Sequence, residues 1–241
     1  MIGLGTMINV AGILLGGLLG VLFGRLISPR HQDSLCKACG ICVLFLGIGG
    51  ALEGMLAVSA TGIESGRSLL IIASLALGAL LGELINLEDG LERFGEWLKK
   101  KTGNGGDNRF TEGFVTASLT VCVGAMAIVG SIQDAMFGDY SILLTKAVLD
   151  LIIVMVLTSS LGQGCVFSAL PVALLQGSVT ALARLVAPLM TEAALGNLSL
   201  VGSILIFCVG VNLVWGKTVR VANFLPAVIL AAAAAFLPFP L

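Results

Sequence analysis

Charged and amide side chains interrupt several of the long apolar stretches of this 241-residue chain. Glu53, Gln133 and Asp134 lie near the ends of two such stretches, and Lys146 and Asp150 stand four residues apart in a third. An ionisable side chain at the centre of a bilayer costs about 2.5 to 3.5 kcal/mol or more unless it is paired or hydrated. Such side chains should therefore either pair with one another or line a polar path.

Lys146 and Asp150 can be interpreted in two ways, because residues four apart share one face of a helix. The two charges could simply neutralise each other and order the bundle. Alternatively, they could form a hydrated, solute-facing cluster with Glu53, Gln133 and Asp134, to which Arg184 would also belong. We favour the hydrated cluster because intramembrane charges often mark transport pathways.

A second set of polar side chains lies in other apolar stretches, and it comprises Glu83, Gln163, Gln176, Asn212 and Asn223. We expect Gln176 near the middle of its helix, close to Pro171, whose ring frees a backbone carbonyl. The others belong near the cytoplasmic half. Polar groups on both sides of the membrane midplane are what a transporter with alternating access needs. The run from Thr158 to Cys165 is either a helix break that could coordinate an ion or a tight interhelical turn.

Catalytic, metal and cofactor chemistry find little support in the sequence. His31 is the only histidine, no serine has a base at a recognisable spacing, and no glycine-rich loop ends in Lys-Ser or Lys-Thr. Cys36, Cys39 and Cys42 superficially resemble a metal-binding run but lack the fourth cysteine of the ferredoxin pattern. We expect no enzyme activity, no metal and no cofactor, with an intramembrane enzyme as a minor alternative.

The composition identifies the solvent that surrounds these residues. The chain is 57% hydrophobic and 11% charged, whereas soluble domains are about 45 to 50% apolar and 25% charged. So few charges cannot cover a soluble core, which indicates a protein embedded in a lipid bilayer. The net charge of −1 offers no basic face, so we expect no nucleic-acid partner.

The apolar stretches predict an all-α bundle of about eight transmembrane helices, since each is close to one bilayer thickness and none alternates as a barrel strand would. They span residues 4–27, 38–58, 68–86, 113–133, 142–160, 165–189, 199–215 and 223–240. We divide the chain into a three-helix unit (1–86), a connector (87–112) and a five-helix unit (113–241).

The connector is predicted to be an amphipathic helix on the cytoplasmic surface. Leu87, Leu91, Phe94 and Leu98 repeat at three and four residues and give one apolar stripe opposite a charged face. Trp97 and the lysines that follow it suit the level of the lipid headgroups. We favour a membrane-bound connector over a partner-binding site.

The distribution of Lys and Arg predicts the orientation, because cytoplasmic loops are enriched in them. With the N-terminus outside, ten of the thirteen cationic side chains fall on the inner side, and only Arg67, Lys146 and Arg184 fall on the outer side. An even number of helices then places both termini outside.

Regularly spaced glycines and a partial internal repeat indicate how the helices pack. Gly12, Gly16, Gly20 and Gly24 recur every fourth residue, which is typical of closely packed membrane helices. A shift of 80 residues aligns residues 42–53 with 122–133 and residues 81–83 with 161–163. Slim, glycine-rich helices suggest a homodimer, with the glycines as one possible interface.

Several segments together resemble the prokaryotic multi-pass membrane family catalogued as domain of unknown function 554. The matching segments are Gly5-Thr6 with Asn9, Gly124 to Asp134, Lys146 with Asp150, Phe167-Ser168 with Gln176 to Ser178, and Val221 to Ala227. The resemblance implies a bacterial cytoplasmic-membrane protein, often called a transport protein, but brings no substrate. It implies that Gln133, Asp134, Lys146, Asp150, Gln176 and Asn223 belong to the family's pattern, and it adds Asn9.

The leading hypothesis is a transporter or channel for a small polar solute or ion. Its candidate site comprises Glu53, Gln133, Asp134, Lys146 and Asp150 in the outer half of the membrane, with Asn9, Gln176, Asn212 and Asn223 as further candidates. The mixture of acid, amide and lysine favours a polar or zwitterionic solute, or proton-coupled exchange, over an anion. The alternative is a membrane scaffold whose charges only pair with each other.

Overall fold

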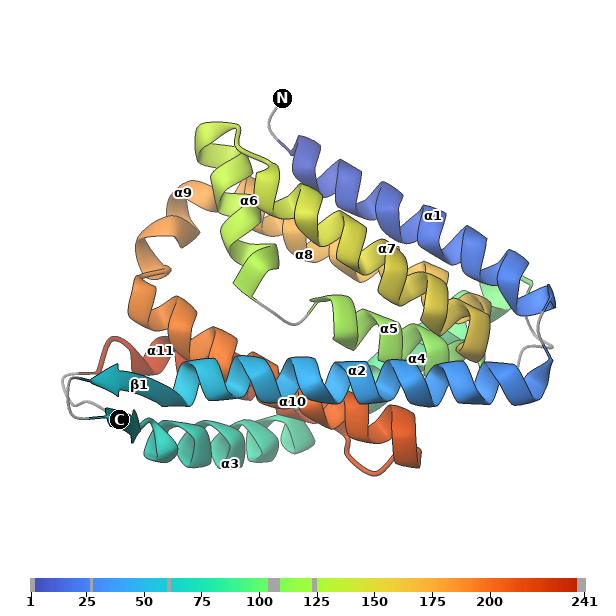
Figure 1. The fold of residues 1–241 in the computed structure, drawn as a ribbon. Helices are drawn as coiled ribbons and strands as arrows, with labels where there is room; N and C mark the ends of the chain where they lie inside the picture. The colour runs from blue at the N-terminus through green and yellow to red at the C-terminus, as the bar shows by residue number, and fades with distance from the viewer. Residues whose placement is uncertain (1–2, 27, 60–61, 104–108, 123–124, 238–241) are drawn as a thin grey trace.

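The computed structural model describes residues 3–26, 28–59, 62–103, 109–122 and 125–237, which are almost entirely helical (Figure 1). The first part contains α1 (Leu4–Leu26), α2 (Pro29–Met55), β1 (Leu56–Ser59), β2 (Gly62–Ser65), α3 (Ser68–Ile85), α4 (Leu87–Lys101) and α5 (Phe110–Cys122). The second contains α6 (Ala125–Phe137), α7 (Ser141–Leu161), η1 (Gln163–Ser168), α8 (Ala169–Ala181), α9 (Ala183–Val186), η2 (Ala187–Leu189), α10 (Glu192–Trp215), η3 (Val221–Phe224) and α11 (Leu225–Ala234). The predicted all-α bundle is confirmed.

Six of the described helices are long and apolar enough to cross a membrane: α1, α2, α3, α7, α8 taken with η1, and α10. A seventh span results if α5 and α6, whose axes differ by 60°, are taken as one broken helix. The last apolar segment, Val221–Ala234, is shorter. Each of the eight predicted stretches therefore has a helical counterpart, but only six or seven pass as full spans by length and composition.

Several predicted helices have different boundaries in the structure: α2 starts at Pro29 rather than at residue 38, α10 starts at Glu192 rather than at residue 199, and the stretch 165–189 is divided among η1, α8, α9 and η2. The helix predicted over 38–58 ends at Met55, and the chain continues into an antiparallel hairpin in which Leu56 pairs with Ser65. The Leu56 backbone is already extended, and the polar, β-branched sequence that follows suits a strand better than a helix. The helix predicted over 113–133 is divided between α5 and α6, with residues 123–124 outside the described residues.

The run from Thr158 to Cys165 is an interhelical turn, the second of the two expectations for it. Gly162 ends α7 with φ 94° and ψ −170°, a conformation that only glycine adopts readily. Gly216 ends α10 in nearly the same way, with φ 84° and ψ 179°. After each glycine the chain forms a short 3-10 helix and then an α-helix with proline near its start, so α7–α8 and α10–α11 are built alike.

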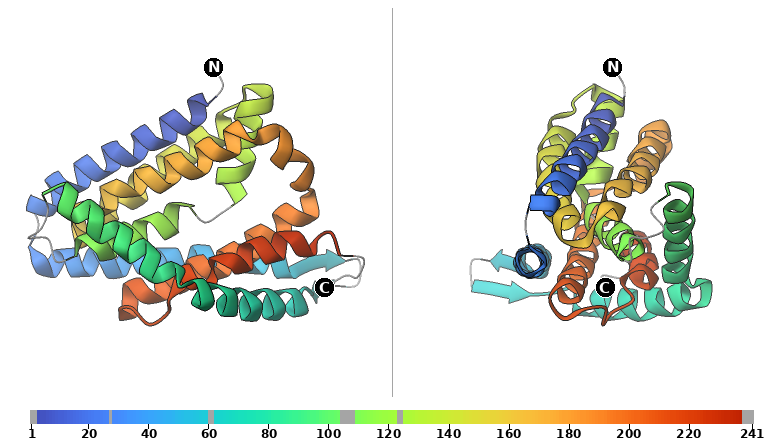
Figure 2. Two further views of the ribbon diagram at one scale, coloured as in Figure 1. Left: turned by 180° about the vertical axis from the view of Figure 1, so that it is seen from behind. Right: turned by 90° about the vertical axis from the view of Figure 1, so that its right-hand side faces the viewer.

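The helices form two groups (Figures 1 and 2). One contains α1, α5, α6, α7 and α8, and the other contains α2, α3, α10 and α11, while α4 packs against α5 and η3. Within the groups α1 lies along α7, α2 along α10, and α3 along α11. An apolar cluster that includes Phe110, Phe114, Leu205 and Val209 joins the two groups.

The glycines of α1 act in helix packing within the chain. A Cβ atom on Gly12 would lie 2.8 Å from the carbonyl oxygen of Ala147, and one on Gly20 would lie 2.5 Å from that of Met155. The two helices run parallel in direct backbone contact, as small residues allow. The suggestion that these glycines form a dimer interface is therefore wrong, because α7 of the same chain already covers them.

The loops rich in basic residues lie at one end of the bundle, at the right of Figure 1. The α1–α2 junction, the start of α5 and the loop between α10 and η3 all meet there. The hairpin and the α9 region lie at the opposite end. This arrangement brings together the basic loops that the distribution of Lys and Arg assigned to one side of the membrane.

Candidate functional site

Lys146 and Asp150 form the predicted pair at the point where α5 ends. The Lys146 ammonium lies 2.9 Å from the Asp150 carboxylate and donates a second hydrogen bond, also of 2.9 Å, to the carbonyl of Val121. Both side chains are buried. In a continuous helix the Val121 carbonyl would accept from the backbone of residue 125, so the ammonium satisfies a group that the break between α5 and α6 leaves without its usual donor.

Two buried amides lie on helices that pack in the same group as α7. An apolar cluster contains Ile13 of α1, Val154 of α7 and Val172 of α8. Asn9, Asp150 and Gln176 are each four residues, about one helical turn, from one of these three cluster members. We call Asn9, Lys146, Asp150 and Gln176 the polar layer.

The amides of the polar layer lack hydrogen bonds of ordinary length among the described residues. Asn9 and Gln176 are completely buried; the Gln176 amide has no hydrogen-bond partner among the described residues, and the Asn9 amide makes no hydrogen bond of ordinary length there. Asn9 faces the Asp150 carboxylate, to which its amide can donate a weak hydrogen bond. An unsatisfied buried polar group costs about 1–3 kcal/mol, so native proteins usually supply water or a ligand at such places.

Further unpaired atoms surround the layer on the same group of helices. They are the hydroxyls of Thr6, Ser118, Thr158, Ser168 and Thr180 and one carboxylate oxygen of Asp134. Outside this group of helices, the described residues hold only one such atom, the amide nitrogen of Asn223. The unsatisfied polar groups thus lie almost entirely in the group of helices that contains the broken helix, and broken helices are where transporters build ion and solute sites.

The other predicted residues of the outer cluster have different positions. Asp134 is completely buried and accepts a 3.0 Å hydrogen bond from the backbone N–H of Gly5, so it caps the first turn of α1. Gln133 is half-buried beside it. Glu53 is exposed near the end of α2, which lies along α10, and Arg184 is exposed on α9. The expected convergence of all six residues is therefore not observed.

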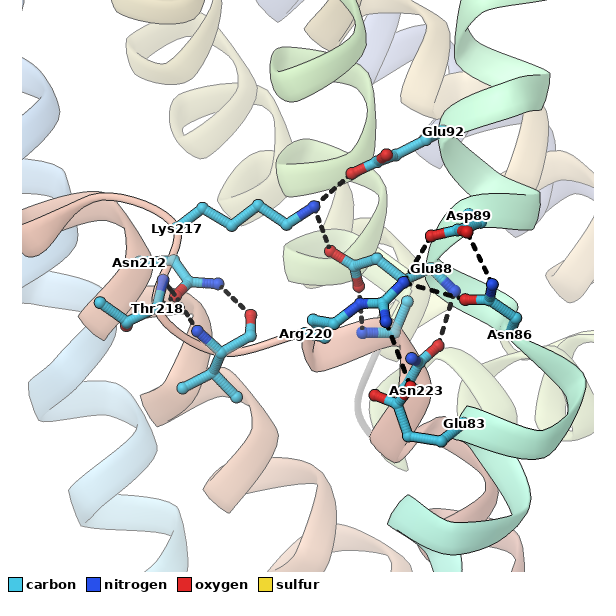
Figure 3. A network of polar contacts seen from close by, with 12 residues as sticks. Glu83, Asn86, Glu88, Asp89, Glu92, Asn212, Lys217, Thr218, Arg220 and Asn223 are labelled. Carbon is cyan, nitrogen blue, oxygen red and sulfur yellow. Dashed lines mark hydrogen bonds and ion pairs between the residues drawn. The ribbon is translucent and has the colours of Figure 1, made fainter.

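Asn212 and Asn223 lie at the other end of the bundle, where they hold the chain between α10 and α11 (Figure 3). The Asn212 amide accepts from the backbone of Thr218 and Val219 and donates to the carbonyl of Val219. The Asn223 carbonyl accepts a 2.7 Å hydrogen bond from the backbone N–H of Glu88. In these contacts both amides organise backbone.

Glu88 is a buried acid, although the amphipathic pattern of its helix placed it on a solvated face. Its carboxylate accepts from the backbone N–H of Ala222 at 2.9 Å and lies 3.1 Å from the Lys217 ammonium, which also binds Glu92. Nearby, Arg220 binds Glu83 at 3.1 Å, Asn86 at 2.9 Å, and Asp89 (Figure 3). We call the contacts of Lys217 and Arg220 the ion-pair network.

The charge on Lys217 is stabilised by this network. Burial lowers the pKa of Lys217, but its hydrogen bonds with Glu92 and Glu88 outweigh burial, and the pKa lies above its ordinary value. The burial of Glu88 could not be predicted from the sequence, because acids in the first turn of a helix are common at the surface.

Helix α4 is amphipathic as predicted, and α5 covers part of its apolar stripe. Leu98 is buried, and the Phe94 ring lies 5.7 Å from that of Phe114 on α5. Trp97 remains half exposed, with the Lys101 ammonium 5.0 Å from its ring centre. The helix therefore binds the bundle through one part of the stripe and presents an aromatic and basic edge outward.

A pocket of about 470 Å³ opens at the end of the bundle where the basic loops meet. It lies between the two groups of helices and is bounded by α2, α4, α5, α10 and the loop after α10. Its charged lining consists of Asp33, Lys37, Glu88, Glu92, Arg109, Glu112 and Lys217. We call it the end pocket. No pattern in the sequence indicated it.

Metal and cofactor chemistry have no visible site in the part of the chain that the structure describes. No group of three or more His, Cys, Asp or Glu side chains there is arranged to hold a metal ion. Cys36, Cys39 and Cys42 are free thiols along α2, and Cys42 faces outward.

A bundle of apolar helices around a buried charged layer defines a polytopic membrane protein. The chain belongs to the family described as a protein of unknown function, DUF554, whose model matches residues 4–236. It is 32% identical over 226 residues to the uncharacterized membrane protein YdfK of Bacillus subtilis (strain 168), covering 94% of this chain and 93% of that protein. It is 29% identical over 235 residues to the uncharacterized protein YqgA of Escherichia coli (strain K12), covering 95% and 94% of the two chains. No solved structure matches the chain significantly.

Proposed function

We propose that this membrane protein is a transporter or channel for a small polar solute or ion, and that the polar layer is its binding site. The observation that carries the proposal is the Lys146 ammonium, which binds both Asp150 and the backbone carbonyl of Val121 at the break between α5 and α6. Broken helices in transporters expose backbone groups to their cargo at such places.

The chemistry of the polar layer favours an uncharged or zwitterionic solute. Lys146 and Asp150 together carry no net charge, Asn9 lies beside Asp150, and Gln176 offers an amide donor and acceptor without partners among the described residues. A solute with an ammonium and a carboxylate could exchange partners with the ion pair, while the amides bind its polar atoms. An anion would meet the Asp150 carboxylate at the same site.

A scaffold without transport remains the second candidate, because the Lys146 ammonium has two good partners within the chain. The two functions differ in what the amides do. A scaffold has no use for a buried amide that binds nothing, whereas a solute site needs polar groups that are free when it is empty. The Gln176 amide, which has no partner among the described residues, therefore favours transport.

The cellular location is part of the same proposal. We place the protein in the bacterial cytoplasmic membrane, with the end that carries the basic loops on the cytoplasmic side. Both termini would then lie outside. The gathering of the basic loops at one end of the bundle supports this orientation.

Osmotic swelling of proteoliposomes tests the function with simple solutes as probes. Vesicles are shrunk in glycine, urea or sodium chloride, and the rate of re-swelling reports entry of each probe. We expect faster re-swelling than in protein-free vesicles with glycine or urea. Because a hydrogen bond to a charged group contributes about 1.5 to 3 kcal/mol, D150N should slow this entry about tenfold or more.

Controls separate binding from stability. The exposed Thr145 lies on the same helix, so T145V should leave the rate unchanged. The double variant K146M/D150L removes the whole pair, which proteins often tolerate, and should remain folded but inactive. Wild-type rates equal to those of empty vesicles for every probe, or unchanged rates in D150N, would contradict the proposal.

A further inference from the structure

The end pocket follows one stripe of α5 toward the polar layer. Glu112, Val115 and Leu119 line it at spacings of three and four residues, so it extends along about two turns of the helix. The next residue on this stripe is Cys122, the last of α5. Cys122 lies close enough to Lys146 and Asp150 to sense their charges. The stripe therefore connects the pocket with the layer.

An apolar plug separates the two. Leu119 is buried at the inner end of the pocket and belongs to the same apolar cluster as Val43, Leu205 and Val209. These residues come from α5, α2 and α10, so the plug closes the space between the two groups of helices. Beyond Leu119 the same helix reaches Val121, whose carbonyl accepts a hydrogen bond from the Lys146 ammonium.

The charges on the wall of the pocket suit the same class of solute. Four acids and three bases line the pocket, and the Lys217 ammonium is already held by Glu88 and Glu92 at its rim (Figure 3). Such a mixed wall neither concentrates anions nor repels zwitterions. Its floor is apolar, which excludes bare ions more strongly than small neutral molecules.

We propose that the end pocket is the access vestibule through which a small uncharged or zwitterionic solute reaches the polar layer, and that Leu119 closes it in this conformation. This inference rests on the proposed function, since it supplies the route to the proposed site. The pocket is water-filled up to Leu119, and movement of the plug opens the way around the end of α5.

The native cysteines test the route, because a charged methanethiosulfonate reagent modifies only thiols that water reaches. Cys36 lines the pocket, Cys42 faces outward on the same helix where lipid covers it, and Cys122 lies beyond the plug. In lipid nanodiscs, with the trimethylammonium reagent and peptide mass spectrometry, Cys36 should react about tenfold or more faster than Cys42 and Cys122.

The variant L119A should open the plug. We expect the modification rate of Cys122 to rise about tenfold, while that of Cys36 stays unchanged. L200A is the matched control, because Leu200 is equally buried in a different apolar cluster; it should leave Cys122 protected. If L119A aggregates, V209A removes a second part of the same plug.

Two results would overturn the inference. Reaction of Cys36 as slow as that of Cys42 would show that the pocket is dry, and continued protection of Cys122 in folded L119A and V209A would show that it is a dead end. Both measurements are independent of flux. Vesicles that show no transport while Cys122 becomes reactive would instead contradict the proposed function and leave the route intact.

Discussion

Gln176 places an amide without a hydrogen-bond partner among the described residues inside a membrane bundle. Leucine has a similar volume and no polar atoms, so Q176L should stabilise the empty protein by about 1 kcal/mol. We expect the melting temperature in detergent to rise by about 2–4 °C and solute entry to fall. Scanning fluorimetry and vesicle swelling measure the two effects.

The half-buried Gln133 provides the comparison for this prediction. Q133L should change the melting temperature by less than Q176L does, because the Gln133 side chain still reaches the surface. A fall in the melting temperature of Q176L would mean that bound water already satisfies the amide in the resting protein.

For single residues, the sequence predicted which side chains are unusual better than it predicted what they contact. The spacing of Lys146 and Asp150 was sufficient to predict that they share a helix face, and the pair is confirmed. The position of Asn9 beside them depends on the packing of α1 along α7, which no local pattern encodes. Asp134, like Asp150, is an acid in an apolar stretch, but it caps α1 by accepting from the backbone N–H of Gly5. This contact depends on how the helices pack, so the sequence did not predict it.

Helix pairs packed through glycine are sensitive to a single methyl group. A Cβ on Gly12 would lie 2.8 Å from the Ala147 carbonyl oxygen, so G12A should force α1 away from α7 and cost about 1–3 kcal/mol. On α2, Gly49 has no heavy atom within 4 Å of such a Cβ, and G49A should be neutral or slightly stabilising. Thermal unfolding of both variants checks this, and equal melting temperatures would refute it.

The ion-pair network should hold α4 and η3 together over a wide pH range. The pKa of Lys217 is raised in the folded protein, so its contribution is fully present below the unfolded value of about 10.4 and is lost as pH rises through the folded value. Amide hydrogen exchange over residues 87–92 and 217–223, corrected for intrinsic rates, should thus show equal protection at pH 6 and pH 9.

Removal of the Lys217 ammonium tests whether the ion-pair network protects these segments. K217Q should accelerate exchange in both segments, because Glu88 then remains buried without its cation. K37Q, which breaks only an exposed pair with Asp33, should not. Unchanged exchange in K217Q would show that the backbone contacts of Glu88 and Asn223 suffice.

Elements were predictable where the apolar pattern is long and uniform, as in α1, α3 and α7. The break between α5 and α6 was not, because the run over 113–133 is apolar throughout and the interruption is stabilised by Lys146 from another helix. The hairpin after Met55 was missed for a related reason. Leu56, Ala57 and Val58 continue the apolar run of α2 in the sequence, which outweighed the polar and β-branched residues after them, and pairing with residues 63–65 makes them a strand.

For the whole molecule, the two ends of the bundle, one with the basic loops and one with the hairpin, predict which parts of the chain lie on the same side of the membrane. A reporter enzyme inserted after residue 103 and one fused to the C-terminus should report opposite compartments, with the C-terminus outside. A cytoplasmic signal from the C-terminal fusion would refute this topology. A reporter inserted between β1 and β2 should agree with the C-terminal fusion.

The lipid environment and the all-α class followed from composition alone, because 11% charge leaves no other solvent. The end pocket and the division into two groups of helices did not. Both depend on which helices lie side by side, and uniformly apolar helices carry almost no information about their neighbours.

The partnership of α1 with α7 also determines when the protein can be completed in the cell. Gly12 and its partner Ala147 are separated by roughly 130 residues, which a ribosome needs on the order of ten seconds to synthesise. Until α7 has been made, the glycine face of α1 lacks the helix that covers it in the folded protein. Assembly of the first group of helices is therefore post-insertional, and a chain truncated before α7 would present an unpaired first helix to the membrane's quality-control proteases.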